Sequence, residues 1–211
     1  MIAPRYPRPA HETIIEPFAG SACYSLCYPD RRVLLFDRDP VIVGVWQYLI
    51  HATEDEILSL PDVPRGADVR EIMPASPAQD LVGFWINQGA ATPRFTATKW
   101  SSWGARMRER IASQLHAIRH WQVHQCSYDE IPNYRATWFV DPPYQDKGRY
   151  YRYGSSQIDY AHLAEWCLSR SGQKIVCENE VATWLPFAPF TIARSQKKGR
   201  KSKEVIYEEA D

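Results

Sequence analysis

Short apolar runs separated by polar, turn-forming residues organise the first part of the chain. Thr13–Ile15 and Val33–Phe36 are such runs, and each predicts a buried strand. A helix is predicted over Pro40–His51, because proline suits the first helical position, Asp39 suits the cap, and apolar residues then recur at helical spacing. Strands that alternate with helices in this way indicate a parallel sheet.

The same alternation returns in the last third of the chain. Thr137–Val140 and Lys174–Cys177 predict two further strands, and a capping-box pattern predicts a helix over Ser156–Arg170 between them. Phe187–Ile192 and Glu204–Tyr207 predict a final hairpin at the sheet edge. The expected fold is therefore α/β and Rossmann-like, with a mostly parallel open sheet and a C-terminal antiparallel hairpin.

The middle of the chain has a different character. Prolines divide residues 53–102 into short segments, and a long amphipathic helix is predicted over Trp103–His124. Its apolar stripe consists of Met107, Ile111, Leu115 and Ile118. We expect residues 53–134 to form a largely helical insertion in a core made of residues 1–52 and 135–211.

Composition limits the class of protein and indicates its cellular compartment. The 211 residues carry 25 basic and 25 acidic side chains, so the protein is not a uniformly basic nucleic-acid binder and any basic patch must be local. The five cysteines form no C-x-x-C pair, which argues against a disulfide framework or a structural zinc site. The longest apolar stretch, Val41–Ile50, is too short to span a bilayer, and we expect a cytoplasmic protein that does not enter the membrane.

Three of the predicted strands end in an acidic residue, namely Glu16, Asp37 and Asp141. The carboxyl edge of an open parallel sheet is where such folds bind ligands. A carboxylate after the second strand suits the two hydroxyls of a ribose, so Asp37 is the predicted nucleoside binder. The turn around Gly20 would allow a close approach of backbone to ligand, although a plain packing turn explains the same small residues.

The segment Asp141-Pro142-Pro143-Tyr144 is the most specific pattern in the chain. Two consecutive prolines end the strand, remove two N–H donors and leave rigid carbonyls beside a carboxylate. An exocyclic amine of a base fits these acceptors, because its two N–H groups can meet the Asp141 carboxylate and the Pro142 carbonyl while Tyr144 stacks on the ring. The alternative is a proline-rich surface turn with a structural aspartate.

Such an amine is a poor nucleophile, since its lone pair is delocalised into the ring. Acceptors that hold its hydrogens favour the pyramidal nitrogen that can attack a sulfonium methyl group, and this chemistry requires no metal. A base within a duplex cannot reach such a pocket, so the target would have to be flipped out.

These segments together resemble the motifs of Dam-type (D12 class) DNA adenine N6-methyltransferases. Residues 16–21 are similar to the family's motif I, Asp37 to motif II and residues 141–144 to motif IV, and the order of cofactor motif, inserted recognition region and catalytic motif is also similar. The resemblance covers roughly residues 9–50 and 135–208. It implies a Rossmann-like methyltransferase fold, S-adenosylmethionine as cofactor and DNA as partner.

The resemblance also implies roles for individual residues. The cofactor-binding residues would be Glu16, Pro17, Phe18, Ala19, Gly20, Ser21, Asp37, Arg38 and Asp141. The catalytic residues would be Asp141, Pro142, Pro143 and Tyr144.

The chain departs from the family pattern in two places. Family members begin with a Lys/Gly-rich segment that contacts the methionine end of the cofactor, whereas only Met1–Arg8 precede the first matching stretch here, so Arg5 and Tyr6 are candidates to replace it. The insertion does not match the recognition region of GATC-specific enzymes, and the target sequence is therefore not carried over.

A basic run between the two strands of the predicted hairpin is the candidate phosphate contact. It contains Arg194, Lys197, Lys198, Arg200, Lys201 and Lys203. The alternative is a solvated hairpin tip. On the predicted long helix, His116, His120 and His124 recur every four residues, but no carboxylate or thiol joins them at ligand spacing, so we expect no metal.

The resulting hypothesis is methyl transfer from S-adenosylmethionine to the N6 amine of a flipped adenine in DNA. Cytosine N4 methylation and RNA adenine methylation are rivals, because each target presents a similar conjugated amine. A nucleic-acid-binding protein that keeps the fold without catalysis is a rival from another class.

Overall fold

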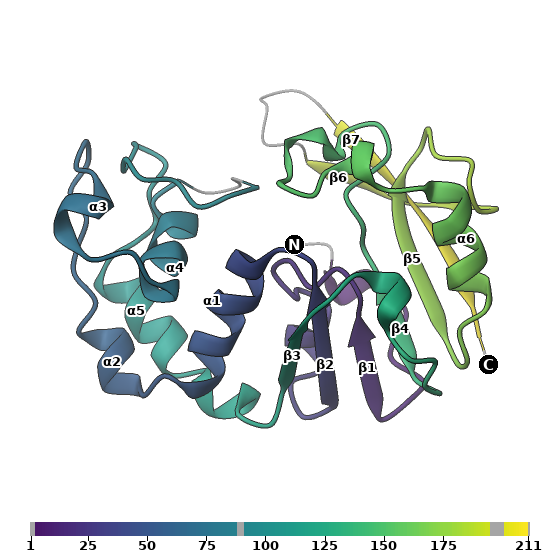
Figure 1. The fold of residues 1–211 in the computed structure, drawn as a ribbon, viewed down its shortest axis with the longest axis horizontal. Coiled ribbons are helices and arrows are strands. Elements are labelled where there is room, and N and C mark those ends of the chain that lie inside the picture. The colour runs from purple at the N-terminus through teal and green to yellow at the C-terminus, as the bar shows by residue number, and fades with distance from the viewer. Residues whose placement is uncertain (1–2, 88–90, 195–200, 211) are drawn as a thin grey trace. The chain divides into compact units, whose positions relative to one another are not determined.

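The computed structural model describes residues 3–87, 91–194 and 201–210, and the side chains of residues 192–194 and 201–202 are not described (Figure 1). The chain forms two compact units. The first consists of residues 1–39 and 121–211, and the second of residues 40–120. The boundaries between core and insertion were predicted from the sequence at residues 52/53 and 134/135, whereas the two units divide the chain at 39/40 and 120/121.

The first unit is built on one seven-stranded sheet with the order β3-β2-β1-β4-β5-β7-β6. The strands are β1 (Thr13–Glu16), β2 (Arg32–Asp37), β3 (Gln122–Gln125), β4 (Thr137–Val140), β5 (Lys174–Asn179), β6 (Ala188–Arg194) and β7 (Lys201–Glu209). The first five strands in this order run parallel, while β7 is antiparallel to both β5 and β6. The predicted fold class is confirmed, including the C-terminal hairpin.

Both faces of the central strands are buried, as their continuous apolar runs require. On one face, Ile15 and Trp138 pack in a core cluster with Leu163 and Trp166 of helix α6 (Tyr160–Leu168), which lies against the sheet in Figure 1. On the other face, the ring of Tyr24 stacks on Phe139 with centroids 4.2 Å apart. The sheet is thus fixed from both sides.

Helix α6 begins later than predicted. Its cap is Asp159, whose carboxylate accepts the N–H groups of Ala161 (3.0 Å) and His162 (3.2 Å), whereas the predicted capping box began at Ser156. A carboxylate that satisfies two free N–H groups is a stronger start than a serine hydroxyl. Short 3-10 helices surround the sheet of this unit: Ala3–Arg5, Ser25–Cys27, Tyr128–Glu130, Gly148–Tyr150 and Ser155–Gln157.

The second unit is helical. It contains α1 (Pro40–His51), α2 (Glu54–Leu58), α3 (Val69–Ile72), α4 (Pro77–Trp85), α5 (Ala105–Ala112) and the 3-10 helix Leu115–Ile118. Val45 of α1, Ile57 of α2 and Leu81 of α4 share one core cluster with Leu115. The predicted bounds of α1 are confirmed.

The long helix predicted over Trp103–His124 is wrong. Helix α5 ends at Ala112, where the Ser113 hydroxyl donates to the Arg110 carbonyl (3.1 Å), and the chain then makes a 3-10 turn before β3. Leu115 and Ile118 are buried in that turn, and their spacing in the sequence is the same as that of apolar residues on one face of an α-helix. His116, His120 and His124 therefore do not share one helix, since His124 belongs to β3.

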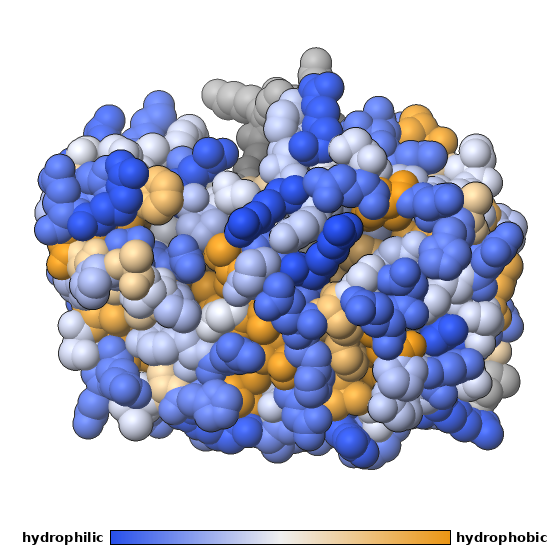
Figure 2. Space-filling model, in the orientation of Figure 1, coloured by the Kyte–Doolittle hydropathy of each residue, from blue (hydrophilic) through white to orange (hydrophobic). Residues whose placement is uncertain are grey.

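No helix among the described residues is long and apolar enough to cross a membrane. On the face shown in Figure 2, hydrophilic residues predominate and apolar residues form patches among them.

Candidate active site

The sheet brings the acidic strand ends together. In the parallel register, Glu16 pairs with Leu35, and Ile15 pairs with Trp138. Because β1 lies between β2 and β4, Asp37 at the end of β2 and Asp141 directly after β4 stand on either side of the Glu16 strand at one edge. This is the carboxyl edge of the parallel strands, where the sequence pattern predicted the site.

Asp37 joins the end of β2 to the turn that follows β1. Its Oδ2 accepts the N–H of Gly20 (3.1 Å) and its Oδ1 accepts the N–H of Asp39 (2.8 Å). Gly20 and Ala22 both have φ of +43°, and the Ala19 N–H donates to the Phe36 carbonyl (2.9 Å). Burial raises the pKa of Asp37, and hydrogen bonds from the backbone N–H groups of Asp39, Gly20 and Arg38 oppose that shift. The turn is therefore tight, and its Gly20 is exposed to solvent. Its backbone is hydrogen-bonded to the Asp37 carboxylate, which keeps further acceptor capacity.

Glu16 has a different position from Asp37. It is 2 % exposed, and its Oε1 accepts the Ser25 N–H (2.9 Å). Burial raises the pKa of Glu16 to about 8. This side chain therefore anchors the Ser25–Cys27 turn, and its predicted contact with the cofactor stays a prediction.

The other residues of the predicted cofactor loop have mixed positions. Pro17 and Ala19 are buried, while Ser21 is exposed, with its hydroxyl 3.2 Å from the Cys23 sulfur. The ring of Phe18 lies 5.6 Å from that of Tyr128. The Arg38 guanidinium stacks over Tyr153 at 4.9 Å, at the rim of the strand end.

The Asp141–Tyr144 segment is held by hydrogen bonds on several sides. The Tyr160 hydroxyl donates to the Pro143 carbonyl, and the Gly148 N–H donates to the Tyr144 carbonyl (2.6 Å). Within the described residues, the Pro142 carbonyl accepts no hydrogen bond. The segment therefore presents one free carbonyl beside the Asp141 carboxylate.

Gly148 is required for this packing. A Cβ at this position would lie 2.6 Å from the Pro143 carbonyl carbon, much closer than any real contact. The loop after the prolines can fold back on them only because residue 148 has no side chain.

Asp141 directly follows β4 at the carboxyl edge of the parallel strands. The residue remains open to solvent, yet protein atoms surround its carboxylate. This low solvation, followed by the charges of Glu204 and Glu178, raises the pKa of Asp141 to about 7, against the opposing effect of a hydrogen bond with Tyr144. The group therefore changes protonation near neutral pH.

Two acidic residues of the site, Glu178 and Glu204, were not predicted. Glu178 is completely buried, and its Oε1 accepts the Gln145 N–H (2.7 Å) directly after the Asp141–Tyr144 segment. Glu204 is 7 % exposed, and its Oε2 accepts the Tyr144 hydroxyl (2.8 Å). The signal for both was an acidic residue directly beside apolar strand residues, Cys177 in β5 and Val205 in β7, because burial of a carboxylate is costly unless it has a partner.

The N-terminal segment lies beside these residues. Tyr6 stacks on Phe190 with centroids 4.7 Å apart and contacts Phe139 edge-on. Burial, followed by the charges of Cys177 and Asp141, raises the pKa of Tyr6. Arg5 donates to the Thr191 hydroxyl (2.8 Å). Tyr6 thus borders the site, while Arg5 is bound to β6.

The basic run is only partly described. Arg194 and Lys201 pair across the β6–β7 hairpin, and Lys203 forms an ion pair with Glu180 (2.7 Å). The remaining three predicted phosphate contacts, Lys197, Lys198 and Arg200, lie outside the described residues.

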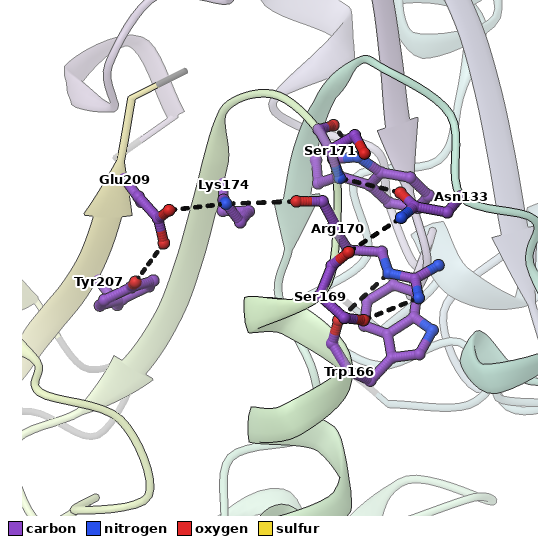
Figure 3. Close-up of polar contacts among 9 residues, drawn as sticks. Asn133, Trp166, Ser169, Arg170, Ser171, Lys174, Tyr207 and Glu209 are labelled. Atoms are coloured by element: carbon purple, nitrogen blue, oxygen red, sulfur yellow. Dashed lines mark hydrogen bonds and ion pairs between the residues drawn. The ribbon is translucent and has the colours of Figure 1, made fainter.

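A shallow hollow at the opposite, amino edge of the sheet is lined by Arg135, Arg170, Ser171, Gly172, Lys174, Glu209 and Ala210. Its polar groups pair with one another, as Figure 3 shows: Lys174 binds Glu209 (2.9 Å) and the Arg170 carbonyl (3.2 Å), and Arg170 lies over the Trp166 ring. These contacts join α6 to β5 and β7, so this hollow has a structural role.

No protein-family model and no curated protein matches this chain. Among solved structures, the chain is similar to a conserved hypothetical protein from Streptococcus pyogenes, at 9 % sequence identity and a TM-score of 0.35, over 92 % of this chain and 84 % of that one. The fold assignment rests on the strand order and register.

Proposed function

We propose that this protein transfers a methyl group from S-adenosylmethionine to the N6 amine of a flipped-out adenine in DNA. The observation that carries the proposal is the Asp141 carboxylate beside the free Pro142 carbonyl, in a segment fixed by Tyr160, Gly148 and Glu178. An exocyclic amine has two N–H donors, and these two acceptors match them.

The cofactor fits the turn between β1 and Asp37. Gly20 is exposed, and the nearest atom to a Cβ built on it is 4.0 Å away, so the backbone there has open space on that side. Asp37 accepts the Gly20, Asp39 and Arg38 N–H groups, and the acceptor capacity that remains on its carboxylate is available to a ribose hydroxyl. When bound, S-adenosylmethionine supplies an electrophilic methyl group on a positively charged sulfur.

The charge of the site supports a cationic ligand. Glu16, Asp141, Glu178 and Glu204 act on one another electrostatically, and their mutual repulsion contributes to the raised pKa values of Glu16, Asp141 and Glu178. A sulfonium ion placed among them would relieve that repulsion.

The chain's own residues would orient the amine. The Asp141 carboxylate accepts one N–H and the Pro142 carbonyl accepts the other, which turns the nitrogen lone pair away from the ring. The methylated nitrogen must then release a proton, and the Asp141 carboxylate can take it because its pKa lies near 7. Tyr144 is fixed through its hydroxyl, so its ring is available as a rigid surface for the base.

The choice of adenine in DNA follows from the family resemblance of the motifs, since cytosine and RNA adenine carry similar amines. The test is methylation of genomic DNA and total RNA by wild type, Asp141→Ala and the control Asp30→Ala, an exposed aspartate outside the site. Nucleoside analysis should detect N6-methyladenine in DNA with wild type and Asp30→Ala and none with Asp141→Ala.

Other outcomes would replace the proposal with a defined alternative. N4-methylcytosine, or methylated adenine in RNA only, would reassign the substrate. Calorimetry that detects no binding of S-adenosylmethionine to the purified protein would favour a nucleic-acid-binding protein without catalysis.

A further inference from the structure

The loop that follows the Asp141–Tyr144 segment combines aromatic and basic residues. Within residues 147–153, which we call the tyrosine loop, are Lys147, Arg149, Tyr150, Tyr151, Arg152 and Tyr153. Tyr150 is 68 % exposed and Tyr151 is 52 % exposed. The Arg149 guanidinium lies over the Tyr150 ring at 4.9 Å and donates to its hydroxyl (2.8 Å), so a cation and an aromatic ring lie side by side in this loop.

The tyrosine loop is anchored to both ends of the site. Gly148 packs on Pro143, and the Gln157 amide donates to the Arg152 carbonyl (3.1 Å). Arg152 forms an ion pair with Asp39 at 3.5 Å, and Tyr153 lies beneath Arg38. These contacts therefore hold the loop between the end of β4 and the end of β2.

Tyr151 is the ring nearest to the reacting groups. Its backbone N–H donates to the carbonyl of Gly148 (3.4 Å), the residue that packs on Pro143. Its pKa is raised by the surrounding protein and by the charge of Asp141, although half of the side chain is open to solvent. The loop folds back on Pro143, and the charge of Asp141 acts on the Tyr151 hydroxyl, while about half of the Tyr151 side chain is open to solvent.

We propose that Tyr151 is a second stacking surface for the target base, opposite the role assigned to Tyr144, and that Lys147 and Arg149 contact the phosphates beside it. The proposal rests on the proposed function and specifies how its nucleic-acid substrate is held. Aromatic rings with interleaved cations match the alternating bases and phosphates of a strand opened around one flipped nucleotide.

Tyr151→Ala and Tyr151→Phe test the stacking role. With genomic DNA as substrate, Tyr151→Ala should raise KM for DNA roughly 5- to 150-fold, the effect of one lost base–aromatic contact, while Tyr151→Phe stays near wild type because it keeps the ring. Calorimetric binding of S-adenosylmethionine should be unchanged in both variants. The control is Tyr134→Ala, which removes a tyrosine that is 48 % exposed and precedes β4 at the opposite edge.

A binding measurement separates this inference from the proposed function. Fluorescence anisotropy with a random-sequence single-stranded oligonucleotide should show weaker binding by Tyr151→Ala, and the double variant Lys147→Ala/Arg149→Ala should lower the salt dependence by about two phosphate contacts. This readout is available even if wild type transfers no methyl group.

Equal KM and oligonucleotide affinity for wild type and Tyr151→Ala would overturn the proposal. A Tyr151→Phe variant as impaired as Tyr151→Ala would also overturn it, because the hydroxyl and not the ring surface would then be required. Circular dichroism spectra that match wild type establish that each variant is folded.

Discussion

The hydroxyl of Tyr144 donates a 2.8 Å hydrogen bond to the carboxylate of Glu204, 60 residues further along the chain. The bond joins the segment after β4 to strand β7, which are separated in the sheet by β5. A second bond, from the Gln145 N–H to Glu178 of β5, fixes the next residue. The position of the proposed catalytic segment therefore depends on two strands that follow it in the sequence.

Tyr144→Phe should destabilise the protein by about 1–3 kcal/mol, because it leaves the buried Glu204 carboxylate without this donor. Glu204→Gln should cost less, since the amide oxygen still accepts the Tyr144 hydroxyl. Urea unfolding at neutral pH measures both free energies. An equal loss in the two variants would contradict the bond as the source of stability.

Methyl transfer should decline as the pH falls through about 7, where Asp141 becomes protonated. The protonated group accepts fewer N–H bonds and cannot take up a proton, so kcat decreases while S-adenosylmethionine binding changes less. A pH–rate profile of the wild type with saturating cofactor is the measurement. A constant kcat between pH 6 and pH 8 would exclude Asp141 as the proton acceptor.

Glu16 should make the protein less stable as the pH rises. Its folded pKa of about 8 lies above the unfolded value of about 4.3, so the folded state binds the extra proton between these values. The free energy of unfolding should fall by up to about 1.4 kcal/mol per pH unit in that window through this group. Glu16→Gln should reduce the slope in denaturant titrations at pH 5 to 8, and an unchanged slope would assign it to other carboxyls.

Asp37→Ala should weaken S-adenosylmethionine binding by about 1.5–3 kcal/mol, the contribution of charge-assisted hydrogen bonds. Asp37→Asn should have a smaller effect, because one oxygen can still accept the Gly20 N–H. Isothermal titration calorimetry with the Asp30→Ala control measures the difference. Wild-type affinity in Asp37→Ala would remove this carboxylate from the cofactor site.

Gly148→Ala should lower kcat at least tenfold with the overall fold retained, since the new methyl group displaces the loop from Pro143 and a small misplacement of reacting groups is costly. The matched control is Gly44→Ala on α1, where the new Cβ meets Pro77 at an ordinary 3.6 Å. Single-turnover kinetics compare the two. A wild-type rate in Gly148→Ala would show that the loop tolerates the shift.

The strands and the acidic edge were predictable because apolar runs and their end residues are local signals. β1, β2 and β4 were located correctly, and Asp37 and Asp141 stand at the carboxyl ends of two strands on either side of β1. These features need only the sequence period and the rule that parallel strands end together.

Other features depended on contacts distant in the sequence. The end of α5 could not be predicted, because Leu115 and Ile118 continue the apolar spacing of a helix although they are buried in a 3-10 turn. The pairing that makes Gln122–Gln125 a strand comes from β2 and leaves no local pattern. Glu178 and Glu204 entered the site only through strand pairing, in which Glu178 is opposite Val205 and Glu204 opposite Asn179.

The position of β7 between β5 and β6 affects how the protein is made. During synthesis, β6 leaves the ribosome before β7, yet among the described strands it pairs only with β7. β6 can therefore join the sheet only after β7 has been made, and non-local pairing of this kind is slow. Glu204 belongs to β7, so a nascent chain that ends before β7 lacks the carboxylate that binds the Tyr144 hydroxyl. The contacts of the proposed catalytic segment are therefore complete only after β7 has been translated.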